Sequence, residues 1–419
     1  MGLIRSIPLP ARLPLIRTAL AVALSAREPG WKRLARPGPI PGPLVVSGFL
    51  GETLGVGRGG DTTADALERA GFPVQRQSLR PAQKRLWTLG NKPPVSDRPG
   101  GVWLIHANAP EVDVALMAHD PADWLGRRRI GYWAWETTLA PRAWTRTALW
   151  MDEIWVPSRF TGQAVAAALD AVGRPDQKAK IRIMPHPVRA PEGVRTRPDR
   201  FGLKPGTQHA LVMFDGRSAF ARKNPWAAIE AWIRAFPEPR DNARLIIKGT
   251  MLRIDPASAR RLAGLVAERS DMVLIEDQLS DAELWDLLAS IDLLISLHRA
   301  EGFGLVAAEA MALGKPVVMT GWSGVLDFAD SRTAALVPYR LVEARDPSGA
   351  YRKGQWAEPD ITAAAELVRG LISNPERASA LAAGAPARIA ALSQAWTPES
   401  LDRLPLASLI DKSARRPAS

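Results

Sequence analysis

The stretch HRAEGFGLVAAEAMALGKPVV (residues 298–318) joins an apolar strand, DLLISL (292–297), to an apolar helix. Between them, the turn Glu301-Gly302-Phe303-Gly304 opens the helix. The free N–H groups and the positive terminus of a helix start attract anions, and glycines let a phosphate approach the backbone closely. Glu309 follows in the second turn of the helix. We therefore expect a diphosphate at this turn, with one carboxylate on each side of it.

Short apolar strands alternate with helical runs on both sides of this stretch. Near-continuous apolar strands separated by helices indicate parallel sheets that are covered on both faces. Two such series flank a segment rich in Pro, Gly and Arg (186–208), which is typical of a linker. The sequence therefore predicts an α/β protein with two doubly wound, Rossmann-like domains facing a cleft. Ligands of such sheets lie beyond the carboxyl ends of the strands.

The predicted boundaries follow from these breaks. We expect a basic, proline-rich tail at 1–43, an N-terminal acceptor domain at 44–190, a linker at 191–207, a C-terminal nucleotide-sugar domain at 208–375, and C-terminal helices with a basic tail at 376–419. Prolines in the first tail argue against a long helix, so only Leu15–Arg27 is expected to form one. The segment 50–60 is predicted to be a glycine-rich turn that precedes a helix at Asp61–Ala70.

The charge of the chain is strongly positive, with 55 Lys and Arg against 43 Asp and Glu. This excess favours anionic partners, but no basic–aromatic array of the kind that binds nucleic acid is present. The residues before position 41 hold seven basic side chains and one acid, Glu28. Two interpretations stay open for this tail: a disordered basic extension, or a short anchor around Leu15–Arg27 at an acidic membrane surface. The absence of cysteine excludes disulfides and thiolate chemistry and suits a reducing compartment.

A second charged motif, FDGRSAFARKNPWAAIEAW (214–232), also follows an apolar strand and opens a helix. Its turn carries Arg217, Arg222 and Lys223, and Lys248 ends the next strand along the chain. Cations at neighbouring strand ends would neutralise a diphosphate leaving group, although ordinary surface charge on a basic protein explains each of them singly.

The opening stretch resembles the signature of the family-four glycosyltransferases, which are retaining enzymes of the GT-B fold. That signature has two glutamates around Gly-Phe-Gly with seven residues between them. The resemblance implies that Glu301 contacts the donor sugar and Glu309 the ribose, with the rest of the donor site in Gly302, Phe303, Gly304 and Leu305. It further implies that Arg222, Lys223 and Lys248 bind the diphosphate and that Arg217 shares this role. DEIWVPSRF (152–160) and QWAEPD (355–360) are similar to a polysaccharide-associated branch of the family.

The first half of the chain contributes fewer site residues. The resemblance places Gly55 and Gly57 in a loop that faces the transferred sugar, and His106, at the end of the strand WLIH, near the donor sugar; a structural histidine is the competing interpretation. In GYWAWE (131–136), Trp135 and Glu136 are candidates for acceptor binding. Because Trp133 and Trp135 alternate, we expect one of them to point into the core.

These observations predict a hexosyltransferase that moves a sugar, with retention, from a nucleotide-diphosphate sugar to a saccharide or lipid-linked saccharide acceptor in polysaccharide or glycan biosynthesis. We assign the catalytic roles to Glu301, His106, Lys223 and Arg217. No Asp-x-Asp motif is present, so we expect neither a metal nor a cofactor. A GT-B nucleotide-sugar epimerase and a non-catalytic, membrane-attached sugar-binding protein are the alternatives. The expected location is cytoplasmic, with peripheral contact at the inner face of the membrane.

Overall fold

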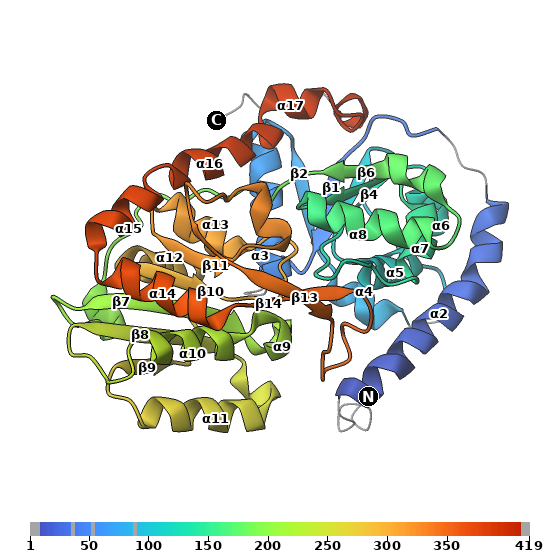
Figure 1. The fold of residues 1–419 in the computed structure, drawn as a ribbon. Helices are drawn as coiled ribbons and strands as arrows, with labels where there is room; N and C mark the ends of the chain where they lie inside the picture. The colour runs from blue at the N-terminus through green and yellow to red at the C-terminus, as the bar shows by residue number, and fades with distance from the viewer. Residues whose placement is uncertain (1–8, 35–37, 52–54, 87–89, 412–419) are drawn as a thin grey trace. The chain divides into compact units, whose positions relative to one another are not determined.

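The computed structural model describes residues 9–34, 38–51, 55–86 and 90–411, which form two compact units (Figure 1). The first unit contains the chain up to Pro187, the short segment Ser348–Lys353 and the residues from Ser393 onward. The second contains Val188–Pro347 and Gly354–Leu392. Each unit is thus assembled from separate stretches of sequence, whereas continuous domains were predicted.

A six-stranded parallel sheet in the order β2-β1-β3-β4-β5-β6 forms the centre of the first unit. Alternate residues of its strands enter separate apolar clusters: Val45, Trp103 and Ile105 face one side, while Val46 and Leu104 face the other. This period of two explains why both faces are covered by helices. The strands are β1 (Leu44–Gly48), β2 (Val74–Ser78), β3 (Val102–His106), β4 (Arg128–Tyr132), β5 (Glu153–Val156) and β6 (Ile181–Ile183).

The helices of the first unit include one from each end of the described chain. They are α2 (Leu9–Arg33), α3 (Gly55–Arg69), α4 (Arg80–Arg85), α5 (Ala109–Ala118), α6 (Pro121–Trp124), α7 (Trp144–Thr147), α8 (Arg159–Asp170) and α17 (Pro398–Asp402). Several contacts tie the C-terminal segment to the sheet region. The Trp396 indole donates to the Pro185 carbonyl at 2.7 Å, and Gly42 forms a β-bridge with Ile410.

Helix α2 corrects the predicted limit of Leu15–Arg27, because it runs through Pro14 and Pro29 from Leu9 to Arg33. An interior proline costs about 3 kcal/mol, so packing must offset this cost. Leu24 and Trp31 are buried in the core of the unit. Glu28 is also buried and accepts hydrogen bonds from the Arg146 guanidinium and the Trp150 indole. Long-range contacts therefore extend the helix beyond its local propensity.

Helix α3 also begins earlier than predicted, at Gly55 rather than Asp61. The glycine-rich segment is the first part of this helix and not a turn. A Cβ on Gly59 would lie 2.8 Å from His186 Cε1 and 3.1 Å from His106 Cε1, and one on Gly60 would lie 2.9 Å from Leu50 Cδ2. The glycines therefore let the helix lie directly against the ends of the strands, at the propensity cost of glycine in a helix.

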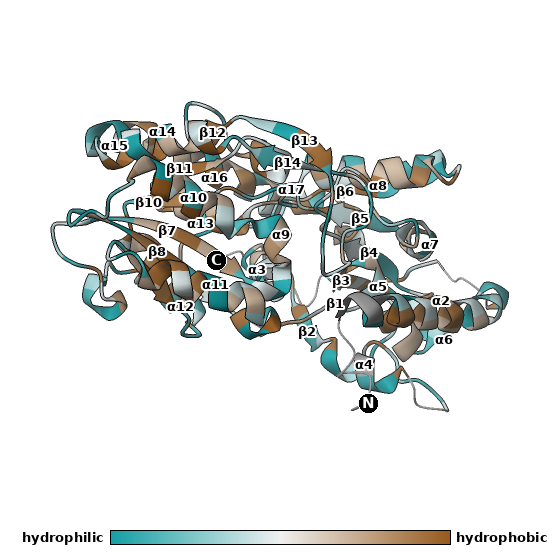
Figure 2. Ribbon diagram, turned by 60° about the horizontal axis from the view of Figure 1, so that its bottom comes forward, coloured by the Kyte–Doolittle hydropathy of each residue, from teal (hydrophilic) through white to brown (hydrophobic). Residues whose placement is uncertain are grey.

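The second unit repeats the architecture with a parallel sheet in the order β12-β11-β10-β7-β8-β9. In Figure 2 the apolar colour runs along β7 and β8, and apolar clusters cover both faces of the sheet. Its strands are β7 (Gln208–Asp215), β8 (Ala243–Thr250), β9 (Met272–Ile275), β10 (Leu293–Ser296), β11 (Val317–Thr320) and β12 (Ala335–Val337), beside an antiparallel hairpin of β13 (Tyr339–Glu343) and β14 (Gln355–Pro359).

The helices of this unit are α9 (Phe220–Lys223), α10 (Pro225–Ala235), α11 (Pro256–Ala267), α12 (Asp281–Ser290), α13 (Leu305–Ala312), α14 (Ile361–Ile372), α15 (Pro375–Ala382) and α16 (Ala385–Leu392). The segment predicted as a linker packs onto the sheet instead of running free, because Phe201 and Leu203 are buried in one of the apolar clusters. The two doubly wound sheets that the sequence predicts are both present.

Candidate functional site

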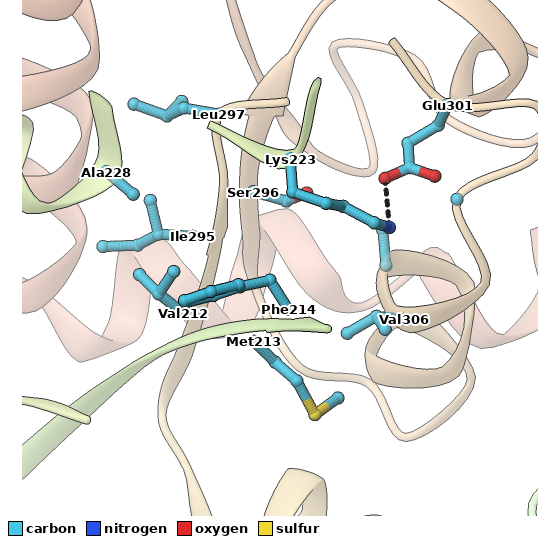
Figure 3. Close-up of a pocket in the computed structure, with 12 residues that line it drawn as sticks. Val212, Met213, Phe214, Lys223, Ala228, Ile295, Ser296, Leu297, Glu301 and Val306 are labelled. Carbon is cyan, nitrogen blue, oxygen red and sulfur yellow. Dashed lines mark hydrogen bonds and ion pairs between the residues drawn. The ribbon is translucent and has the colours of Figure 1, made fainter. Parts of the chain in front are cut away.

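A charged cluster lies beyond the carboxyl end of β10 in the second unit. The Glu301 carboxylate is 2.5 Å from Lys223 Nζ and 3.3 Å from Arg222 Nη1 (Figure 3). The same Arg222 nitrogen donates to the carbonyl of Ala300 at 2.9 Å. All three side chains are largely buried, so these charges interact outside bulk water, where electrostatic interactions are strong.

The backbone of the signature turn is fixed by residues that follow the neighbouring strand, β11. The Glu301 N–H donates to Ser323 Oγ at 2.9 Å. Ser323 has a φ of +74°, and a Cβ on Gly324 would lie 2.4 Å from the Gly302 carbonyl oxygen. Gly304 has a φ of +99°, and a Cβ there would lie 2.5 Å from Val325 Cγ1. Neither glycine can be replaced without moving the turn.

The turn that carries Arg222 and Lys223 is tied to the same loop. Arg299 donates through its backbone N–H to the Arg222 carbonyl at 2.8 Å and through Nη1 to the Ala221 carbonyl at 2.6 Å. Asn224 then enters α10 with a φ of +51°, directly before Pro225. The two charged motifs of the sequence therefore form one structural site.

The charge state of Glu301 follows from its neighbours. Burial alone would raise the pKa of this carboxyl, but Lys223 and Arg222 outweigh burial and lower the pKa to about 2. Glu301 is therefore ionised at neutral pH, and it can accept hydrogen bonds from hydroxyl groups.

A small cavity adjoins this cluster at the start of α13. Its volume is about 20 Å³, which is water-sized. Lys223 and Glu301 border it together with the first turn of the helix (Figure 3). The remaining lining residues are Val212, Met213, Phe214, Ala228, Ile295, Ser296, Leu297, Gly304, Val306 and Ala307.

The other candidates of this unit lie on neighbouring elements. Lys248 is buried on β8, and burial lowers the pKa of its ammonium group although Asp277, Asp215 and Glu276 act in the opposite direction. Glu309 is buried on α13. Arg217 is not brought next to Glu301, because its guanidinium forms an ion pair with Asp215 at 2.6 Å.

The apolar residues of the signature pack into the core of the second unit. Phe303 is buried against Phe328, with ring centroids 5.1 Å apart, and Leu305 is half-buried against the same cluster. Gly302 is buried in the turn, where its carbonyl packs against Gly324.

In the first unit, His106 stands at the carboxyl end of β3, opposite Gly48 of β1. It is buried, and neither ring nitrogen has a hydrogen-bond partner among the described residues. Its ring stacks on Tyr132 at 4.2 Å, and His186 lies 5.7 Å away. Burial lowers the pKa of His106 to about 3 and that of His186 to about 4, so both rings are neutral at pH 7.

Of the remaining candidates of the first unit, the two glycines lie elsewhere than predicted. Gly55 is the first residue of α3, and Gly57 lies in the first turn of that helix rather than in a loop. Trp133 and Trp135 are both buried in the core of the unit, where at least one of them was expected. Residues two positions apart in an extended segment face the same side, so the burial of both side chains needs no break in the alternation. Glu136 is half-buried and accepts a hydrogen bond from the Tyr351 hydroxyl at 2.9 Å.

Several residues at these sites are not among the site residues predicted from the sequence. His186 and Tyr132 form a ring cluster with His106, and the Tyr132 hydroxyl donates to the Met184 carbonyl at 2.6 Å. The sequence does contain a pattern that could have identified His186, because this histidine follows a strand and stands between two prolines. Ser323 and Tyr351 gave no such signal, because only the fold brings them to Glu301 and Glu136.

Comparison with known proteins shows to which family the chain is similar. The family model described as "Family 4 Glycosyltransferase in conflict systems" matches residues 162–398. A D-inositol 3-phosphate glycosyltransferase of Acidothermus cellulolyticus is 28% identical over 304 residues, covering 70% of this chain and 62% of the relative. D-inositol 3-phosphate glycosyltransferase 1 of Catenulispora acidiphila is 34% identical over 153 residues, covering 36% of this chain and 31% of the relative. The chain thus spans only part of the length of these relatives.

Solved structures agree with the fold. HepE of Anabaena, crystallised in complex with UDP and glucose, superposes with a TM-score of 0.57 at 14% identity, covering 86% of this chain and 99% of that one. A glycosyltransferase from Rickettsia africae superposes with a TM-score of 0.58 at 15% identity, covering 86% and 95%. Both likenesses concern the two-sheet GT-B architecture. From the family match, which spans more than half of its residues, the chain belongs to the family-four glycosyltransferases, in the group described from conflict systems.

Proposed function

We propose that this protein is a retaining glycosyltransferase that moves a sugar from a nucleotide-diphosphate sugar to a saccharide or lipid-linked saccharide acceptor. The observation that carries this proposal is the ionised Glu301 between Lys223 and Arg222, beside the start of α13. The cluster offers an acceptor of hydroxyl hydrogen bonds and two cations within one site. Membership of the family supports the same conclusion.

The roles follow from charge and position. Lys223, Arg222 and Lys248 stabilise the diphosphate as the bond to the anomeric carbon breaks, Glu301 holds hydroxyls of the donor sugar, and Glu309 holds the ribose. The leaving phosphate oxygen takes the proton of the acceptor hydroxyl while that hydroxyl attacks the same face of the sugar. These cations and the helix terminus supply the positive charge, so neither a metal nor a cofactor is part of the proposal.

Donor transfer is the direct test. The protein is incubated with radiolabelled UDP- and GDP-sugars and with a panel of acceptors, including D-inositol 3-phosphate because of the names of the relatives. The proposal expects a labelled glycoside whose anomeric configuration matches that of the donor. Conversion of the donor sugar without transfer would identify an epimerase, and binding of nucleotide without turnover would identify a sugar-binding protein.

We also propose that the protein works in the cytoplasm and contacts the inner face of the membrane through α2, where a lipid-linked acceptor would lie. Leu15 and Val22 of this helix are 60% and 64% exposed, and its last turn carries Lys32 and Arg33. A shallow groove beside it is lined by Lys32, Arg142, Arg146 and Arg174, with Glu28 as its one acidic residue. Exposed apolar side chains beside basic ones are typical of interfacial helices. Of the helices that the structure describes, none is long and apolar enough to cross a bilayer.

Liposome binding tests the membrane contact. Because α2 packs into the core through Trp31, point variants are preferable to truncation. Leu15→Asp with Val22→Asp should abolish salt-sensitive binding to acidic vesicles, while Leu341→Asp, at an exposed apolar position on β13, should leave binding unchanged. Equal binding of both variants would contradict a contact through α2. A role in polysaccharide or glycan synthesis is a further part of the proposal, and the identity of the accepted acceptor tests it.

A further inference from the structure

A short segment far along the chain lies over the predicted acceptor residues of the first unit. Ser348–Lys353 connects β13 to β14 but belongs to the first unit by its contacts. In this segment Tyr351 donates its hydroxyl hydrogen to Glu136 Oε2 at 2.9 Å. Its ring lies 5.0 Å from that of Trp135, with an angle of 43° between the planes. One residue therefore makes both an aromatic contact and a hydroxyl–carboxylate contact.

The surface beneath Tyr351 is held by its own bonds. The Trp135 indole N–H donates to Thr137 Oγ1 at 2.8 Å and to the Leu139 carbonyl at 2.9 Å. Its ring packs edge-on against Trp144 at 5.0 Å. The backbone N–H of Ala134, just beyond the carboxyl end of β4, donates to Asn108 Oδ1 at 2.8 Å. The position of Trp135 thus does not depend on Tyr351.

On its other side the segment is bonded to α2 through its backbone. Arg17 of α2 donates to the backbone carbonyls of Ala350 at 3.1 Å and Gly349 at 3.4 Å. Tyr351 is half-buried, in contrast to the buried Trp135 beneath it. A half-buried segment held through backbone carbonyls opens at a lower free energy than the core on which it lies.

We propose that Trp135 and Glu136 form a saccharide subsite and that Tyr351 occupies it in place of a sugar. A sugar binds to such a pair with its ring against the indole and a hydroxyl group on the carboxylate, and the tyrosine supplies both contacts. The subsite lies beyond the carboxyl end of a parallel strand, where ligands of this architecture bind. This inference rests on the proposed function and adds that an acceptor sugar must displace Tyr351. The displaced segment makes acceptor binding weaker than the subsite alone would allow.

Direct binding of saccharides tests the inference without requiring transfer. Methyl α-glucoside, methyl α-mannoside and N-acetylglucosamine are titrated into the full chain and followed by saturation-transfer NMR. Tyr351→Ala should bind at least one of these probes about fivefold more tightly than the wild type, because the competing ring is removed. Tyr351→Phe, which keeps the ring and loses the hydroxyl, should show a smaller gain. Tyr339→Ala, at an exposed tyrosine on β13 of the same hairpin, is the matched control and should show none.

A second variant locates the gain. Glu136→Gln in the Tyr351→Ala background should remove the gain in saccharide affinity. A thermal melt identifies any variant that fails to fold. Unchanged, weaker or undetectable binding to Tyr351→Ala would overturn the inference, and so would a gain that survives Glu136→Gln. Failure of the inference and failure of the proposed function are distinguishable. A failure of binding beside measurable transfer refutes only the subsite, whereas absence of transfer beside a gain in binding refutes only the enzyme.

Discussion

Beyond β10 of the second unit, Glu301 is buried between Lys223 and Arg222, whereas at the end of β3 in the first unit His106 is buried beside Tyr132 and His186. The strands occupy comparable places in two sheets of the same kind. The first site holds a carboxylate whose pKa falls to about 2, and the second holds imidazoles whose pKa values fall to about 3 and 4.

The difference shows how partners decide the charge of a buried group. Burial disfavours the charged form of every titratable side chain. Two adjacent cations reverse that preference at Glu301. Among the residues that the structure describes, no acid is in contact with His106, and its ring becomes neutral. One architecture therefore provides a charged site in one unit and an uncharged, largely aromatic site in the other. The four predictions below test this contrast, beginning with the largest expected effect.

Glu301→Gln should reduce transfer at least about 100-fold, because it removes a charge placed beside the donor sugar. Donor nucleotide should still bind. Glu309→Gln should instead weaken nucleotide binding and leave turnover at saturating donor nearly unchanged. Steady-state kinetics with calorimetric nucleotide titration separates the two, with Glu230→Gln on the exposed side of α10 as the control. Wild-type turnover in both signature variants would mean that the motif has another role.

Lys223→Ala and Lys248→Ala should each lower kcat about 10- to 100-fold and change the donor KM much less, because their charge is needed most when the diphosphate departs. Arg234→Ala, which removes an exposed ion pair with Glu230, should change neither constant. A rise in KM with constant kcat would assign these lysines to ground-state binding. Loss of all activity with EDTA would contradict a metal-free site.

Gly59→Ala and Gly264→Ala should change stability in opposite directions, although both glycines lie in helices. At Gly59 the new methyl group would meet His186 and His106, and we expect a loss of about 2 kcal/mol. At Gly264 of α11 no atom lies within 4 Å, so alanine should stabilise by up to about 1 kcal/mol. Urea unfolding of both variants measures the difference, and equal shifts would show that the rings yield freely.

Acidification should destabilise the folded state through the histidine cluster. The pKa of His106 lies near 3 in the folded protein against an ordinary value of 6.5, so the unfolded chain takes up the proton first. Stability from the neutral ring is full above pH 6.5 and is lost as the pH falls from 6.5 towards 3. Between pH 7.5 and 5.5 this amounts to about 1 kcal/mol. His106→Asn should lose that share of the pH dependence in urea unfolding, and an unchanged pH profile would show that the folded ring is readily protonated.

Much of the fold could be predicted from local pattern. The apolar runs at 292–297 and 244–249 became β10 and β8, and the signature turn opens α13 as expected. Glu301 and Lys223 lie together, although 78 positions separate the two residues. Only the family resemblance assigns both motifs to one donor site. Neither motif alone indicates that the other lies beside it.

Contacts between distant segments account for several features that local pattern does not contain. Helix α2 continues through two prolines because Glu28 pairs with Arg146, 118 positions away. The contact of Tyr351 with Glu136 spans 215 positions. Arg217 is a different case, because its partner Asp215 is only two residues away. Local propensity includes no contribution from contacts between residues far apart in the sequence.

The bridge between Gly42 and Ile410, together with the bond from Trp396 to Pro185, has a consequence for biosynthesis. The sheet of the first unit is made entirely before Pro187, yet the segment that covers part of it follows roughly 200 residues later, after the second unit has been translated. The apolar surface that packs against Trp396, Leu401 and Leu406 therefore stays uncovered while the ribosome synthesises the second unit. The early half is therefore the part of the nascent chain most exposed to chaperones, and a chimera that exchanges this half must bring residues 393–411 from the same parent.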